Sequence, residues 1–193
     1  MQGNTLNLEE LGGKVGGDAA GALGVLLAYI GDQSGVYSAL ENKGPINCNA
    51  LALETGLDSR YLLEFLSANA AHGYVTYQQD SDSFSLSEAQ AAIFAHEGTP
   101  TCMQGFFQAI VSQFATHEAA LETFKSGNGR PWGEHNSCCF CGTDRFFRPG
   151  YEANLLDTWI PSLMGVDEKL KHGAKVADIG CCLLYTSPSP RDS

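Results

Sequence analysis

Residues 48–75 read CNALALETGLDSRYLLEFLSANAAHGYV, and this stretch decides the fold of the N-terminal half. Asn47 is a typical N-cap residue before a helical run, and Gly56 ends that run. Asp58 is suited to capping a second helix, which we expect over 59–72. Two helices joined by a short glycine-containing turn predict a helix-turn-helix.

The segments on either side extend this unit. Two β-like runs, 74–77 and 83–86, flank a polar turn of hairpin length. A hairpin after a helix-turn-helix is the wing of a winged helix. We expect further helices at 18–31, capped by Asp18 and Gly31, and at 35–42 and 87–95.

The C-terminal half is predicted from periodicity and from its glycines and prolines. A long amphipathic helix is expected over 101–125, followed by a turn-rich segment at 131–150. Helices follow at 151–164 and 166–172, and a strand at 175–179. The predicted fold class is mainly α with a small β-hairpin: a winged helix-turn-helix plus linker helices, followed by the first strand of another domain.

Composition is ordinary for a soluble domain: 44% of the 193 residues are hydrophobic and 17% are charged. No apolar run approaches the roughly 18–20 residues of a membrane span, and the N-terminus lacks signal-peptide features. We therefore expect a cytoplasmic protein without a membrane partner.

The seven cysteines include one C-x-x-C, Cys138 to Cys141. His135 is a possible third ligand, but structural zinc needs four, so we expect no metal. Small buried or interfacial residues are the favoured interpretation of these cysteines, ahead of metal binding or redox chemistry.

Charge argues against nucleic-acid binding by the winged helix. Residues 1–96 contain three basic and eleven acidic side chains. Affinity for nucleic acids depends largely on Lys and Arg that neutralise phosphates. This surface is therefore better suited to protein–protein packing than to DNA.

The sequence VADIGC at 176–181 is typical of a buried strand that enters a tight glycine turn. In such a turn, backbone N–H groups approach a ligand at the end of the strand. Residues 182–193 instead match the translation of a transposase-type sequencing adapter. We therefore expect an artefactual tail on a fragment of a longer protein whose native frame has glycine at position 182.

Residues 48–75 together with CGTDRFFRPGYEANLLDTWIP at 141–161 resemble class I S-adenosylmethionine-dependent methyltransferases with an N-terminal winged helix. The resemblance implies that the winged helix forms a homodimer and covers the active site. It also implies a helical linker and a Rossmann-like domain that binds S-adenosylmethionine, with Asp178 and Gly180 matching its cofactor loop. The domains expected are 15–96 winged helix, 97–173 linker, 174–181 start of the Rossmann-like domain and 182–193 tail.

Within the segment 131–151, five polar or aromatic residues are candidates for contacts with cofactor or substrate: Glu134, His135, Arg145, Arg148 and Tyr151. The alternative is a structural loop with a cap and surface ion pairs. For Trp132, Phe146 and Phe147, we favour packing between domains over stacking on a substrate.

Two functions are compatible with these features. One is a methyltransferase fragment, derived from an enzyme that acts on a small molecule. The other is a winged-helix transcription regulator that binds DNA. The acidic balance and the Asp178-x-Gly180 motif favour the first. The sequence identifies neither the methyl acceptor nor the catalytic residues.

Overall fold

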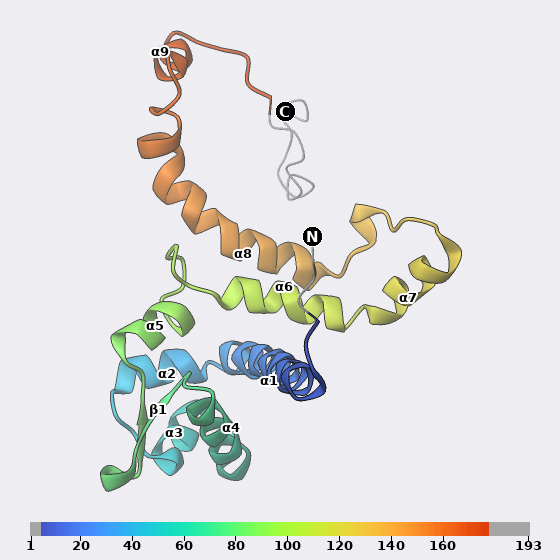
Figure 1. Cartoon of the computed structure of the whole chain (residues 1–193). Helices are drawn as coiled ribbons and strands as arrows, with labels where there is room; N and C mark the ends of the chain where they lie inside the picture. Colours follow the sequence, from blue (N-terminus) through green and yellow to red (C-terminus); the bar gives the residue numbers. More distant parts are fainter. Residues whose placement is uncertain (1–4, 178–193) are drawn as a thin grey trace. The chain divides into compact units, whose positions relative to one another are not determined.

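The computed structural model describes residues 5–177, and the chain divides into two compact units (Figure 1). Unit 1 is Met1–Ala95 and unit 2 is His96–Ser193. The described residues are mainly helical, with one antiparallel sheet of two strands. The predicted fold class, mainly α with a small β-hairpin, is therefore confirmed.

The first helix of unit 1, α1, spans Leu8–Gln33 and begins ten residues before the predicted start. Asn7 and Glu10 form a capping box: Glu10 N donates to Asn7 Oδ1 at 3.0 Å, and Asn7 N donates to Glu10 Oε2 at 2.9 Å. The prediction of 18–31 with Asp18 as the cap was wrong because this stronger N-terminal signal lies upstream. Asp18 is instead paired with Lys14 one turn away, at 2.6 Å.

The next helices are α2 (Val36–Lys43), α3 (Cys48–Thr55) and α4 (Ser59–Ala71). The predicted caps of the last two are confirmed. Asn47 accepts a hydrogen bond from the Ala50 amide, and Asp58 accepts from the Arg60 and Tyr61 amides. Gly56, at φ +71°, closes α3 in a left-handed conformation, so α3 and α4 form the helix-turn-helix.

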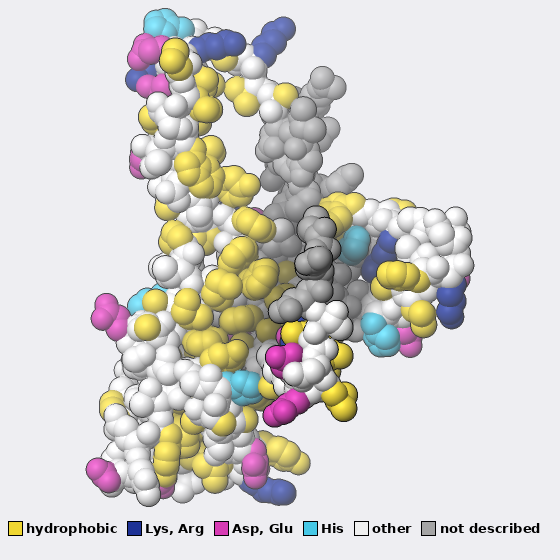
Figure 2. Space-filling model, in the orientation of Figure 1, with side chains coloured by type: hydrophobic (Ala, Val, Ile, Leu, Met, Phe, Trp, Pro, Cys, Tyr) yellow, Lys and Arg dark blue, Asp and Glu magenta, His cyan; other side chains and the backbone are white. Residues whose placement is uncertain are grey.

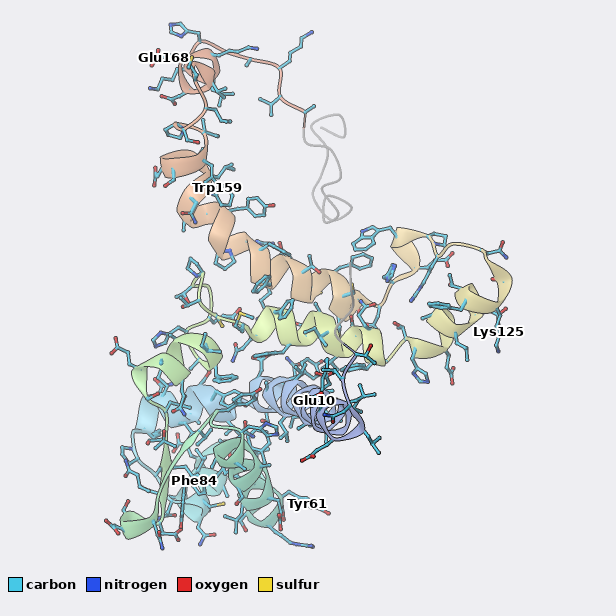
Figure 3. The ribbon with its side chains drawn as sticks, in the orientation of Figure 1. Glu10, Tyr61, Phe84, Lys125, Trp159 and Glu168 are labelled. Carbon is cyan, nitrogen blue, oxygen red and sulfur yellow. The ribbon has the colours of Figure 1, made fainter. Side chains whose placement is uncertain are left out.

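The wing is a hairpin of β1 (Thr76–Gln78) and β2 (Ser83–Ser85), connected by the short 3-10 turn η1 (Gln79–Ser81). Ile46, just before α3, pairs with Phe84 through two backbone hydrogen bonds of 2.8 and 3.0 Å. Phe84, in β2, is labelled beside the hairpin in Figure 3. The wing is thus tied to the start of the helix-turn-helix, and α5 (Glu88–Phe94) ends the unit.

The core of unit 1 surrounds Tyr37, which is fully buried. Its hydroxyl donates to Asn69 Oδ1 at 2.6 Å, and Asn69 donates from Nδ2 to the Phe65 carbonyl at 2.9 Å. Burial raises the pKa of Tyr37 well above its ordinary value, so the phenol stays protonated. Gly31, predicted as a helix end, lies inside α1. A Cβ there would come within 2.4 Å of the Tyr37 ring, so the close packing requires glycine at this position.

Unit 2 begins with α6 (Gln104–Phe114) and α7 (His117–Ser126), where one long helix was predicted. At the junction, two side chains bond to carbonyls of the last turn of α6, a pattern that bends helices. The Thr116 hydroxyl donates to the Ser112 carbonyl at 3.0 Å, and His117 Nδ1 lies 2.9 Å from the Phe114 carbonyl.

After a 3-10 turn, η2 (Trp132–Glu134), the chain forms the 18-residue helix α8 (Ser137–Asn154). The prediction of a turn-rich segment through 150 was therefore wrong. Asn136 caps the helix by accepting from the Cys138 amide at 2.8 Å, and α8 continues through Pro149 and Gly150. A π-helical turn, η3 (Leu155–Trp159), replaces the predicted helix through 164, and α9 (Val166–Lys171) follows.

The predicted strand at 175–179 begins at the edge of the described residues. Residues 175–177 are not in a strand, and 178–179 lie outside the described part of the chain. The predicted domain boundaries stay predictions. Within residues 5–177, none of the helices is both long enough and apolar enough to cross a membrane.

Candidate functional site

The framework of unit 2 is the pair α6 and α8, which lie side by side (Figure 1). Two glycines allow their backbones to touch. A Cβ on Gly142 would lie 2.6 Å from both Ala109 N and Gly105 O, and a Cβ on Gly105 would lie 2.6 Å from Phe146 N. Only glycine fits at such a close backbone approach. This contact fixes which side chains of α8 face α6.

Arg145 of α8 bridges to the segment around the start of α6. Its guanidinium donates to both carboxylate oxygens of Glu97, at 2.6 and 2.5 Å, and to Gln104 Oε1 at 2.8 Å. Gln104 is buried, and Arg145 is about three-quarters covered, with 25% of its side chain exposed. A bidentate, charge-assisted pair of this kind holds its partners in a defined geometry. Glu97 thus balances the positive charge of Arg145 within unit 2.

Arg148 and Tyr151 lie further along α8. Arg148 is exposed and pairs with Asp144 on the same helix, and this hydrogen bond raises the pKa of its guanidinium. Tyr151 is half exposed, and its ring meets Trp159 edge-on, with the ring centroids 5.5 Å apart. Trp159 is labelled in Figure 3 on the turn that follows α8.

Glu134 and His135 precede α8. The backbone carbonyl of Glu134 accepts a hydrogen bond from Arg130, and the ring of His135 lies 5.0 Å from that of Trp132. Trp132 also contacts Phe140 edge-on at 5.4 Å. His135 therefore belongs to a small aromatic cluster with Trp132 and Phe140 at the N-terminal end of α8.

The five candidate contact residues consequently fall into two groups. Arg145, Arg148 and Tyr151 share α8, while Glu134 and His135 precede it, and about 12 Å of helix axis separates Ser137 from Arg145. Asp178 and Gly180 lie outside the described residues. Contact of these seven residues with a cofactor or substrate stays a prediction.

An apolar face on α8 and the segment after it was missed in the sequence. Its members recur four residues apart and are 40–54% exposed: Phe147, Tyr151, Leu155 and Trp159. This spacing is the helical signal that Pro149 and Gly150 obscured. Figure 2 shows hydrophobic side chains along this part of unit 2.

A depression of about 380 Å³ lies near the end of the described chain. It is lined by Ile160, Val166, Lys169, Leu170, Ala174, Lys175, Val176 and Ala177. Among the residues that the structure describes, no group of three His, Cys, Asp or Glu is arranged to hold a metal ion. The described residues of unit 2 therefore offer apolar packing and a largely covered arginine, Arg145, that is paired with Glu97.

Comparison with known proteins identifies the class of the N-terminal unit. Residues 21–96 match the family model of the Rv2258c-like winged HTH domain. This stretch contains the helix-turn-helix of α3 and α4 and the wing of β1 and β2. It is therefore a winged helix-turn-helix domain.

Among solved structures, the chain is similar to PigF with SAH, at 16% sequence identity and a TM-score of 0.52. The match covers 82% of this chain and 49% of that chain, so the chain spans about half the length of PigF. At this identity the likeness shows a shared fold. No curated protein matches the chain.

The first test concerns Arg145. Replacing Arg145 with Gln removes a donor from the Glu97 carboxylate and the buried Gln104 amide, so we expect unit 2 to lose about 2 kcal/mol of stability. The matched control, Arg148→Gln, removes an exposed pair within one helix and is expected to change stability little, because solvent screens such a pair.

Urea unfolding followed by tryptophan fluorescence measures this difference. Both tryptophans of the chain, Trp132 and Trp159, are in unit 2 and report on it alone. Equal losses in the two variants would contradict a structural role for Arg145.

Proposed function

We propose that the chain is the winged-helix and linker portion of a longer S-adenosylmethionine-dependent methyltransferase that acts on a small molecule. The observation that carries the proposal is the fold shared with PigF, a protein solved with SAH, over 82% of the chain. SAH is what S-adenosylmethionine becomes after donating its methyl group. The motif Asp178-x-Gly180 adds independent support from the sequence.

In this proposal the apolar face of unit 2 packs against the cofactor domain. Phe147, Tyr151, Leu155 and Trp159 offer aromatic and aliphatic area at a helical spacing, as a domain-packing surface does. S-adenosylmethionine supplies an activated methyl group, so its transfer depends mainly on binding and orientation. The residues of this chain would then help to enclose the acceptor and exclude water.

Dimerisation through the winged helix is also a proposal. It is supported by apolar side chains along α1 that unit 1 leaves exposed, among them Leu8 at 88%, Val15 at 58% and Leu23 at 61%. A second copy of the chain would remove this apolar surface from water.

Transcription regulation is the competing function for a winged helix, and the placement of the basic side chains disfavours it. Lys14 is paired with Asp18 at 2.6 Å, and Lys43 with Glu54 at 3.0 Å. The guanidinium of Arg60 lies 5.9 Å from the centroid of the Tyr61 ring. All three basic residues of unit 1 therefore have partners within the unit, which remains strongly acidic.

We expect the chain to bind duplex DNA with a dissociation constant weaker than about 100 µM at about 200 mM salt. The measurement is fluorescence anisotropy with a labelled duplex, repeated at about 50 mM salt to expose any electrostatic component. Sub-micromolar binding that weakens steeply with salt would favour the regulator.

Cofactor binding tests the methyltransferase proposal directly. We expect SAH to bind the product of the longer reading frame with a dissociation constant near 1 µM, about −8 kcal/mol, in isothermal titration. The 193-residue chain should show no measurable binding, because a Rossmann-like site needs the strand, glycine turn and helix N-terminus together.

Two variants of the longer protein refine the test. Asp178→Asn should weaken SAH binding, whereas Asp167→Asn on α9 should leave it unchanged. A longer protein that fails to bind SAH would refute the proposal. Tight binding by the 193-residue chain would instead place the cofactor site within these 193 residues.

A further inference from the structure

Three cysteines lie in the first turns of α8, and the structure separates their roles. Cys139 is buried, and Gln113 Nε2 of α6 donates to its Sγ at 3.3 Å. Cys138 is half-buried and Cys141 is exposed. Cys139 therefore faces α6, while the other two offer thiols that a small molecule can reach.

The spacing of Cys138 and Cys141 suits a disulfide. Residues three apart on an α-helix have Cα atoms about 5 Å apart, inside the range of about 4.4–6.8 Å found in disulfides. Their Cβ atoms, about 5–6 Å apart in an ideal helix, must approach by about 1–2 Å to reach the disulfide mean of about 3.8 Å. Cys138 is the second residue of α8 and Cys141 the fifth, so this adjustment falls near the start of the helix, where the Cys138 amide bonds to the Asn136 side chain and not to a helix carbonyl.

We propose that Cys138 and Cys141 form a redox-active dithiol whose substrate is a low-molecular-weight disulfide such as oxidised glutathione. The exposed Cys141 thiolate attacks one sulfur of that disulfide, forms a mixed disulfide and releases one thiolate. Cys138 then attacks Sγ of Cys141, forms the Cys138–Cys141 bond and releases the second thiolate. The two cysteines lose two electrons and two protons, and the small disulfide becomes two thiols.

The other described cysteines are less suited to this reaction than Cys138 and Cys141. Among the described cysteines, Cys102 is buried like Cys139, and Cys48 belongs to unit 1. A metal site is not supported, because the described residues contain no group of three metal-ligating side chains. Phe140 lies between the two thiols in sequence and meets Trp132 edge-on at 5.4 Å, so disulfide formation has a nearby fluorescent reporter.

The test uses the full chain equilibrated with mixtures of reduced and oxidised glutathione, then trapped with iodoacetamide and digested with trypsin. Peptide 126–145 contains three cysteines, Cys138, Cys139 and Cys141. We expect oxidation to convert it from a form with three alkyl groups to one with a single alkyl group on Cys139. Fragmentation of the peptide locates that group, and reduction restores the original form and the original Trp132 emission.

Variants separate the two steps. Cys138→Ser should accumulate a glutathione adduct on Cys141, whereas Cys141→Ser should keep peptide 126–145 fully reduced. The control Cys48→Ser should form the internal disulfide as the unmodified chain does. Three alkyl groups at every glutathione ratio, or a disulfide that joins Cys139 or a cysteine outside the peptide, would overturn the proposal.

Discussion

The close contact between α6 and α8 is the constraint on which unit 2 depends. Gly105 and Gly142 bring the two backbones so near that a Cβ on either would fall 2.6 Å from a main-chain atom. The same contact sets the rotation of α8. It directs Arg145 to Glu97 and Gln104, turns Cys139 toward Gln113, and leaves Phe147, Tyr151 and Trp159 exposed. Both proposals for this unit, a packing surface and a dithiol, follow from that rotation.

Local signals made the winged helix predictable. Asn47, Gly56 and Asp58 act within one turn of their own helices, and each has the role that its residue type favours. The start of α1 was also predictable from a local signal that was overlooked, because Asn7 and Glu10 have the spacing of a capping box. Unit 2 was harder because Gly142 serves the packing of α8 against α6 and does not end a helix. Gly142 and Gly150, with Pro149, have the composition of a turn, and only the position of α6 reveals a helix.

The candidate site was predictable only in part, because the partners of Arg145 lie far away in the sequence. The sequence identified Arg145 as a functional candidate. Its partner Glu97 is 48 residues away, and no motif around Glu97 indicates that the two residues pair. Glu134 and His135 are close to Arg145 in sequence, yet they precede α8 and belong with Trp132. The charge balance of unit 1 was readable from composition, whereas the ion pairs of Lys14 and Lys43 required the structure. Together these features describe an acidic winged helix followed by a helical unit with an apolar face.

The most direct measurement of the central claim compares Gly142→Ala with Gly150→Ala, two substitutions in the same helix. A Cβ on Gly142 meets the backbone of α6, whereas nothing lies within 4 Å of a Cβ on Gly150. Urea unfolding monitored by tryptophan fluorescence should show Gly142→Ala less stable by about 1–3 kcal/mol. Gly150→Ala should be unchanged or more stable by up to about 1 kcal/mol. Equal stability of the two variants would mean that the close contact between α6 and α8 does not organise unit 2.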